Sequence, residues 1–210
     1  MKWLLTSLMS LWLCACSLQP QISATQVEIS PDVWVELPKP AQLSQSFTAS
    51  QLISATWHNE TGHSQSQQLP VQLQVSDQQV LLAGFSSWGT RILSLDYDGE
   101  QIQTQVLSGL ENTVPKPEQV LFNLMITLWP RNAWEAPLNK VRWRIIDDAN
   151  QRTVINEKGE TILAITYSGD TPLSGDTPLS GDIHFKNLPL NYDITIQTLT
   201  LQPTQTASQQ

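Results

Sequence analysis

The sequence predicts a mainly β fold in which a curved antiparallel sheet is covered on its concave face by one apolar helix. Short segments that alternate apolar and polar residues follow one another at hairpin spacing from about residue 47 onward. One stretch, residues 118–129, is apolar on nearly every side and divides the predicted strands into two sets. Charged residues make up only 14% of the chain, which is typical of a sheet whose outer face is covered by neutral polar side chains.

Five strands are predicted before the helix. The segment PVQLQVS alternates strictly, which places Val71, Leu73 and Val75 on one face of its strand. Asp98 and Gly99 predict a two-residue hairpin turn of type I′, because such turns need positive φ angles. The predicted strands are residues 51–57, 70–76, 79–85, 90–97 and 101–107, with the polar loop HNETGHSQSQQ between the first two.

The apolar segment in the middle of the chain predicts a helix. Pro117 and Glu118 suit a helix N-terminus, because proline fits the first turn and an acidic residue favours the positive end of the helix dipole. Pro130 ends the helix. The segment is too short to cross a bilayer, so we expect it to be buried in protein or to lie at an interface. Five further strands are predicted at residues 140–147, 152–156, 161–167, 182–188 and 192–201.

The first twenty residues contain both cysteines of the chain, in the stretch LWLCACS. They begin with a lone positive charge and a short apolar run, which is the pattern of a secretory signal peptide. Leu13-Cys14-Ala15-Cys16 resembles the lipobox of bacterial lipoproteins, which implies that residues 1–15 are a signal peptide and that Cys16 is lipid-modified. By the same resemblance, Ser17 implies delivery to the outer membrane. The alternative is an ordinary secretory signal with incidental cysteines, but an A-x-A-like cleavage site is absent.

The rest of the chain is predicted to form a single domain on a tether. Residues 16–45 are rich in Pro, Gln and Ser and are predicted to be the lipidated N-terminus and the tether. Residues 46–202 are long enough for a sizeable core, and residues 203–210 are predicted to be a disordered tail. A formal net charge of −8 without a basic cluster argues against nucleic acid as a partner.

No pattern in the sequence predicts an enzyme site, a metal site or a cofactor. His58 and His63 lie in a polar loop with one nearby carboxylate, whereas zinc needs three or four well-placed protein ligands. Asp147 and Asp148 alternate to opposite faces of a strand, so they are more typical of the start of a turn than of an acid–base pair. The repeat SGDTPLSGDTPLSGD at residues 168–182 lacks calcium-binding spacing and predicts a hairpin loop lengthened by duplication.

Three stretches of the sequence resemble the LolA/LolB superfamily of periplasmic lipoprotein-localisation proteins, and LolB most of all. VLLAGFSSWGTRILSLDYDGEQI resembles the central hairpin of that family. EQVLFNLMITLWP resembles its inserted helix, which ends in an apolar residue and a proline. ILAITYSGD and PLSGDIHFKNLPLNYDITIQTLTL resemble its closing strands. The likeness spans about residues 47–201 and suggests kinship with a group of proteobacterial lipoproteins related to LolB.

The resemblance implies an unclosed β-barrel whose apolar cavity holds acyl chains. The residues alone favour a different interpretation of the helix, in which its apolar side chains only pack in a filled core. If a cavity is present, Met125 could adapt to different chains because its side chain is flexible. The candidate cavity residues are Leu81, Leu93, Leu95, Leu121, Leu124, Met125, Leu128, Trp129 and Trp143, with Trp134 as a further wall residue.

The resemblance also implies a membrane-insertion loop. In LolB, a hydrophobic residue on a protruding loop helps to pass lipoprotein to the membrane, and the matching position here is Trp88, followed by Gly89 and with Phe85 nearby. This chain differs from the family in having Ser86-Ser87 where Asn-Pro-like turn residues are usual. An indole ring favours a membrane–water interface. The alternative is that Trp88 folds back and caps the mouth of the barrel.

The sequence therefore predicts a non-enzymatic lipoprotein, anchored by lipid to the periplasmic face of the outer membrane. We expect a monomer that binds lipid or lipoprotein acyl chains and assists their delivery to that membrane. A LolA-like periplasmic carrier would be its partner. The alternative is a structural or assembly lipoprotein with a solid core, whose surface binds a protein partner.

Overall fold

The computed structural model describes residues 24–58, 63–111, 116–169, 179 and 181–204. In these residues the chain forms a mainly β fold with two α-helices and one short 3-10 turn, Pro40–Leu43. The strands are β1 (Gln26–Ser30), β2 (Val33–Glu36), β3 (Phe47–His58), β4 (Ser64–Val75), β5 (Val80–Phe85), β6 (Arg91–Tyr97), β7 (Ile102–Val106), β8 (Arg144–Asp148), β9 (Gln151–Ile155), β10 (Thr161–Tyr167), β11 (Ile183–Asn187) and β12 (Tyr192–Pro203). The helices are α1 (Pro117–Leu128) and α2 (Arg131–Lys140).

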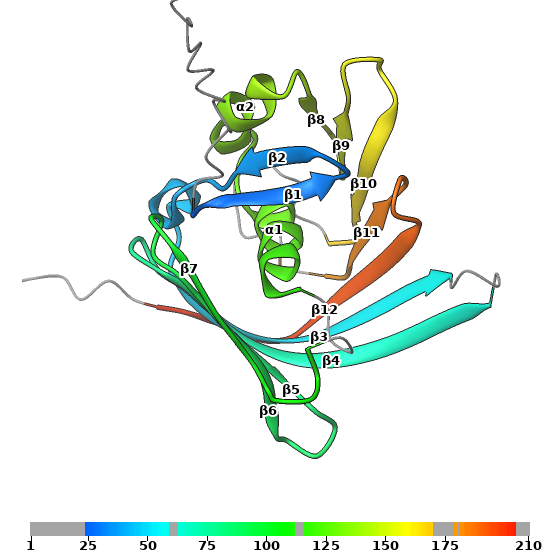
Figure 1. Cartoon of the computed structure of the whole chain (residues 1–210). Coiled ribbons are helices and arrows are strands. Elements are labelled where there is room, and N and C mark those ends of the chain that lie inside the picture. The colour runs from blue at the N-terminus through cyan, green and yellow to red at the C-terminus, as the bar shows by residue number, and fades with distance from the viewer. Residues whose placement is uncertain (1–23, 59–62, 112–115, 170–178, 180, 205–210) are drawn as a thin grey trace, which may run out of the picture.

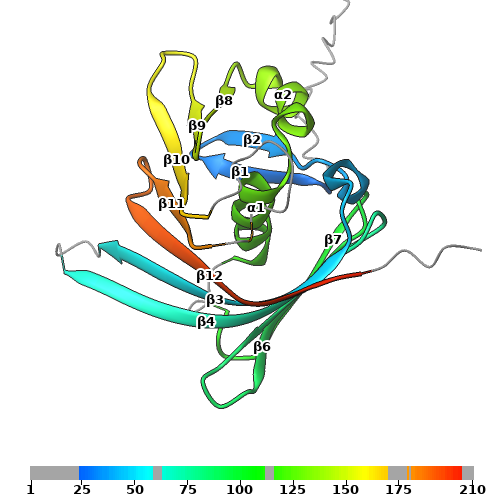
Figure 2. The same cartoon turned by 180° about the vertical axis from the view of Figure 1, so that it is seen from behind.

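Ten of the strands form one antiparallel sheet. Their order is β7-β6-β5-β4-β3-β12-β11-β10-β9-β8, so the two halves of the chain meet where β3 pairs with the last strand, β12. The sheet is strongly curved and open, with β7 at one edge and β8 at the other (Figures 1 and 2). Strands β3 and β4 are 12 residues long, and their paired ends project beyond the rest of the sheet. The predicted curved, unclosed antiparallel fold is confirmed.

Helix α1 lies inside the curve of the sheet, as predicted (Figures 1 and 2). The hairpin of β1 and β2 lies beside it, so the helix contacts β1 as well as β6 and β7. This surrounding explains why the helix is apolar on nearly every side: Leu121, Phe122 and Met125 are fully buried. Its first turn has Pro117 at the N-terminus and Glu118 near the positive end of the dipole, as the sequence indicates.

The second half of the segment predicted as a tether is part of the folded structure. Residues 24–45 contain β1, β2 and the 3-10 turn, and Val27, Ile29 and Val35 are buried in the core. The main chain that follows is held as well, since Tyr97 Oη donates a hydrogen bond to the carbonyl of Pro38 over 3.1 Å. In the sequence, these two strands have too few alternating apolar residues to be distinguished from a Pro- and Ser-rich linker. The predicted signal peptide and Cys16 lie outside the described residues.

A second helix was not predicted. Helix α2 occupies residues 131–140, and the strand predicted from residue 140 begins at Arg144 instead. The helix contains Pro137 in its interior, which is unfavourable locally. Burial of Trp134 and Leu138 compensates for that cost, and Trp134 packs edge-on against Phe122 of α1 with ring centroids 5.6 Å apart. Tertiary packing therefore determines this element.

Two loop predictions also differ from the structure. The hairpin between β6 and β7 has four loop residues rather than two: Asp98 Oδ1 accepts hydrogen bonds from the backbone N–H groups of Glu100 and Gln101, both 2.8 Å, and only Gly99 has a positive φ. Strand β4 begins at Ser64, within the segment predicted as a polar loop, because its polar residues pair with the projecting end of β3. Most of the SGDTPL repeat lies outside the described residues.

Candidate functional site

A groove of about 420 Å³ lies between the first half of α1 and the concave side of β3, β4 and β12. Its volume is within the range of small-molecule sites in proteins, roughly 300–1,000 Å³. Most of its lining is aliphatic or aromatic. The lining residues are Ile53, Ala55, Trp57, Gln67, Leu69, Gln119, Val120, Asn123, Leu124, Leu190, Tyr192, Ile194 and Ile196.

The groove follows the concave face of β3 from the core toward its projecting end. On this face Ala49 and Gln51 are buried, whereas Ile53, Ala55 and Trp57 are half-buried. Leu190, in the loop between β11 and β12, forms part of the groove wall and is 43% exposed. The increase in exposure along the strand means that the groove is closed at the core and opens to solvent at its outer end.

A small polar cluster interrupts the apolar wall of the groove. Asn123 of α1 is 7% exposed, and its Oδ1 accepts hydrogen bonds from Gln119 Nε2 over 3.3 Å and from Tyr192 Oη over 3.2 Å. Tyr192 Oη in turn accepts a hydrogen bond from Asn187 Nδ2 over 3.3 Å. Burial raises the pKa of Tyr192, although its hydrogen bonds act in the opposite direction, so the phenol stays neutral and remains a donor.

The groove lining is uncharged. None of the residues that line it is Asp, Glu, Lys, Arg or His. A charge transferred into such an environment loses hydration without gaining a partner, whereas an apolar chain gains free energy. The arrangement therefore suits binding of an uncharged, largely apolar ligand.

The other end of α1 is held by a buried arginine. Arg152 of β9 is 1% exposed, and its Nη1 donates hydrogen bonds to the carbonyl oxygens of Ile126 and Trp129 over 2.8 and 2.7 Å. Its Nε and Nη2 donate to the two carboxylate oxygens of Asp147 over 2.7 and 2.8 Å. This arginine neutralises the negative end of the helix dipole and satisfies carbonyls that have no partner inside the helix.

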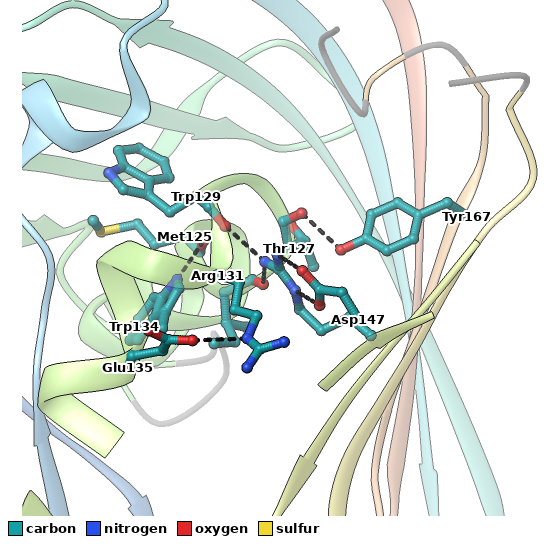
Figure 3. Close-up of polar contacts among 10 residues, drawn as sticks. Met125, Thr127, Trp129, Arg131, Trp134, Glu135, Asp147 and Tyr167 are labelled. Atoms are coloured by element: carbon teal, nitrogen blue, oxygen red, sulfur yellow. Dashed lines mark hydrogen bonds and ion pairs between the residues drawn. The ribbon is translucent and has the colours of Figure 1, made fainter. Parts of the chain in front are cut away.

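Two further donors complete this anchored end, as Figure 3 shows. Tyr167 Oη donates to the carbonyl of Thr127 over 2.8 Å, and Trp134 Nε1 donates to the carbonyl of Met125 over 3.3 Å. The sequence predicts a turn that begins at Asp147 and contains no motif that includes Arg152. The available signal was the lone charge in the strand QRTVI, on the same face as buried Val154.

The predicted cavity residues are mostly core residues. Leu124 lines the groove. Leu81 does not face the helix, because Val80 and Leu82 occupy the inward positions of β5. It is half-buried and lines a groove of about 620 Å³ on the convex side of β4–β7, whose lining is partly polar and partly apolar. The remaining candidates are packed in the hydrophobic core, namely Leu93, Leu95, Leu121, Met125, Leu128, Trp129, Trp134 and Trp143.

The loop between β5 and β6 presents Trp88 to solvent. The side chain is 93% exposed, which contradicts the alternative in which it caps the barrel mouth. The loop is ordered by hydrogen bonds to Ser86: its carbonyl accepts from Gly89 N–H over 2.9 Å, and its Oγ accepts from Thr90 N–H over 3.2 Å. Gly89 has φ +78°, a conformation that other residues rarely adopt. Phe85 is half-buried at the end of β5.

Two general features of the described residues bear on the site. Among them, no group of three or more His, Cys, Asp and Glu side chains is arranged to hold a metal ion. Their helices are also too short or too polar to cross a membrane. Part of the loop with His58 and His63 lies outside the described residues.

The fold and the groove together define a half-barrel protein, with a helix in the concavity of an open sheet and an uncharged groove at one end of that helix. Residues 48–200 match the family described as "Protein of unknown function (DUF3261)". Because the match covers most of the chain, the protein belongs to this family. No curated protein sequence matches it.

Solved structures with a similar arrangement share little sequence with this chain. A LolA superfamily protein from Nitrosomonas europaea is 11% identical with a TM-score of 0.44, over 77% of this chain and 87% of that one. A putative outer membrane lipoprotein-sorting protein domain from Vibrio parahaemolyticus is 10% identical with a TM-score of 0.37, over 79% and 88%. A DUF1329 family protein from Desulfovibrio piger is 7% identical with a TM-score of 0.37, over 80% and 90%.

Likenesses this distant carry no argument about the function of this chain. Kinship with the LolA/LolB superfamily, and with LolB in particular, stays a prediction.

Proposed function

We propose that this protein is an outer-membrane lipoprotein that binds acyl chains of lipids or lipoproteins in the groove beside α1 and assists their delivery to the membrane. The observation that carries the proposal is the groove itself, which is mostly apolar, uncharged and open at one end. Each CH₂ group removed from water contributes about 0.8 kcal/mol, so a buried segment of eight gains about 6 kcal/mol before ordering costs.

The exposed Trp88 supports the delivery step. An indole at the tip of an ordered loop offers an apolar body and one N–H, which suits the interface between head groups and acyl chains. A lipid anchor on Cys16 would keep the groove and this loop at the inner leaflet of the outer membrane. A LolA-like periplasmic carrier remains the proposed donor of the cargo.

A second candidate function is a structural or assembly lipoprotein that binds a protein partner. It is favoured by the filled interior, since most of the side chains expected to line a large cavity are packed in the core instead. In that case the groove would receive an apolar segment of another protein.

Site-specific crosslinking in cells separates the two functions. The photoreactive residue p-benzoylphenylalanine is introduced into the full chain at Val120, which lines the groove. A matched control carries it at Thr56, which lies on β3 between two groove-lining residues and so faces the opposite side of the sheet. After irradiation the chain is purified under denaturing conditions, which remove lipids that are not covalently bound, and the adduct is weighed by mass spectrometry.

Acyl-lipid or lipoprotein adducts at Val120, and none at Thr56, are the expected result. Adducts of a protein without acyl chains at Val120 would replace the proposal by the structural or assembly function. The absence of any adduct at Val120, in a chain that reaches the membrane, would refute acyl-chain binding in the groove.

The role of Trp88 is tested separately from binding. Trp88→Glu should slow transfer of a fluorescent acyl ester from the protein to liposomes and leave the Val120 adduct unchanged. Leu199→Glu is the matched control, because Leu199 is 58% exposed on β12 and lies outside both the loop and the groove. Equal transfer by the two variants would remove Trp88 from the mechanism, and loss of the Val120 adduct in Trp88→Glu would place it in ligand uptake instead.

A further inference from the structure

We propose that Asn123 determines the ligand class of the groove by donating a hydrogen bond from Nδ2 to the carbonyl oxygen of an uncharged acyl ester or acyl amide. This inference rests on the proposed function, because it concerns the same groove. It adds the class of ligand that the groove selects. That ligand is an acyl chain linked through a neutral carbonyl, and not a free fatty acid or a plain hydrocarbon.

The hydrogen-bond network fixes the orientation of the Asn123 amide. The backbone N–H of Leu190 donates to Asn187 Oδ1 over 3.0 Å, so the other atom of that amide, Nδ2, is the donor to Tyr192 Oη. The one proton of Tyr192 Oη is then donated to Asn123, which requires Oδ1 at that position. Both hydrogen bonds that the structure gives Asn123 end on this oxygen.

The amide nitrogen of Asn123, Nδ2, therefore makes no hydrogen bond in this network. It has no acceptor among the described residues, although the residue is 7% exposed and lies in the groove wall between Val120 and Leu124. Asn123 Nδ2 is not fully buried, since among the described residues the one fully buried side-chain N or O atom without a hydrogen-bond partner is Gln51 Oε1, so the nitrogen is accessible from the groove. A carbonyl oxygen on a chain that runs along this wall would supply the missing acceptor.

The surroundings of Asn123 favour a neutral carbonyl over a carboxylate. The groove lining has no cation to pair with a negative charge. The N-terminus of α1 also offers little to an anion: Pro117 has no N–H, and the N–H groups of Gln119 and Val120 already donate to the carbonyl of Lys116 over 3.0 and 3.1 Å. An ester or amide carbonyl needs one donor and no cation, which is what the wall provides.

The test uses three photoreactive probes that differ only at the head of a 16-carbon chain: a methyl ester, a plain hydrocarbon without any oxygen, and the free acid. Each carries a diazirine within the first carbons next to the head of the chain, and an isotope label. The full chain is held in phosphatidylcholine nanodiscs with all three probes and irradiated at pH 7.4. Adducts on the peptide that contains residues 119–124 are counted by mass spectrometry and divided by the adducts each probe makes on the lipid.

In the parent protein the ester should label the groove about tenfold more than the hydrocarbon, the ratio expected for one neutral hydrogen bond, and also more than the acid. Asn123→Leu should bring the ester and the hydrocarbon to equal labelling, with Asn123→Ala as a second variant if leucine is not tolerated. Gln68→Leu is the matched control, since Gln68 lies on β4 between the lining residues Gln67 and Leu69 and so on the face opposite the groove, and it should keep the parent ratio.

Equal labelling by ester and hydrocarbon in the parent, or an unchanged ratio in the Asn123 variants, would overturn the role of Asn123. Labelling by the acid as strong as that by the ester would overturn the selection of an uncharged ligand. These failures differ from failure of the proposed function, in which none of the three probes labels the groove in any variant.

Discussion

The two ends of helix α1 meet the rest of the protein in opposite ways. At its C-terminal end, the carbonyls of Ile126 and Thr127 are satisfied by Arg152 and Tyr167 from the sheet. Toward its N-terminal end, the helix wall carries an amide nitrogen, that of Asn123, with no acceptor among the described residues, and it borders a groove. One end of the helix is fixed to the sheet, and the other leaves room for a ligand.

This difference shows how one apolar helix can serve both stability and binding. The anchored end fixes the position of the helix relative to the sheet beside the groove. The charge of the buried arginine is matched by Asp147, so the anchor brings no uncompensated charge into the core. Substitutions at the anchored end should therefore reduce stability, whereas substitutions in the groove should change ligand binding at little cost in stability.

The largest effect is expected at the anchor itself. Arg152→Met should lower the free energy of unfolding by about 3–5 kcal/mol, because it leaves the Asp147 carboxylate and two helix carbonyls without their donor. Urea unfolding followed by tryptophan fluorescence measures it. Arg131→Met is the control: its ion pair with Glu135 is about half exposed, and its loss should cost less than about 1 kcal/mol. Similar losses for the two variants would contradict the special role of the anchor.

A smaller effect is expected for Tyr167→Phe, about 1–3 kcal/mol, because the carbonyl of Thr127 stays buried without a donor. This residue also predicts a pH dependence. Burial raises the pKa of Tyr167 above its ordinary value of 10.0, as does the charge of Asp147, while Arg152 acts in the opposite direction. The folded protein thus holds the phenol proton more tightly than the unfolded chain does.

It follows that this contribution to stability is complete below about pH 10 and is lost as the pH rises above it. Urea unfolding between pH 8 and 11 measures the loss. Tyr97 and Tyr192 are shifted in the same direction by burial, so the loss should be reduced in Tyr167→Phe but not abolished. A stability that is independent of pH up to 11 would show that these phenols are not buried as described.

The border between the core and the groove can be located with Gln51. Its Oε1 is buried with no hydrogen-bond partner among the described residues, while its Nε2 donates to Thr198 Oγ1 over 3.4 Å. Gln51→Leu should therefore raise the free energy of unfolding by about 1 kcal/mol, since it removes an unpaired acceptor. If Gln51→Leu lowers the free energy of unfolding instead, the Gln51 Oε1 atom accepts a hydrogen bond from a bound molecule. The groove would then extend past the residues described as its lining and into the core.

The smallest effect on stability is expected inside the groove. Ala55→Trp places a large ring in the groove, at a half-buried position outside the packed core, and should change the free energy of unfolding by no more than about 0.5 kcal/mol. The control is Thr56→Trp, on the opposite face of the same strand. A large loss of stability in Ala55→Trp alone would mean that the groove is part of the core and has no space for a ligand.

Much of the fold could be predicted because its strands carry their own pattern. The ten strands of the large sheet and helix α1 follow from alternation, turn residues and two prolines, each a local signal. The hairpin of β1 and β2 and helix α2 could not be predicted in this way. The first has strands of five and four residues, and the second contains Pro137, so both depend on burial against α1 and the sheet.

The site was harder to predict than the fold. The apolar residues of α1 were expected to line a cavity, but an apolar side chain has the same sequence signature whether it faces a cavity or a filled core. Leu124 and Met125 are neighbours in sequence, and only the first lines the groove. The residues that distinguish the groove, Asn123 and Tyr192, come from segments far apart in the chain. Their pairing depends on β12 returning beside β3, which no local pattern encodes.

The most direct test of the central claim combines crosslinking with a filled groove. The full chain with p-benzoylphenylalanine at Val120 is irradiated in cells, with and without Ala55→Trp, and with Thr56→Trp as the control. The account predicts an adduct with the mass of an acyl lipid or lipoprotein in the parent and in Thr56→Trp, and its loss in Ala55→Trp. An adduct that persists when the groove is filled, or that contains no acyl chain, would contradict it.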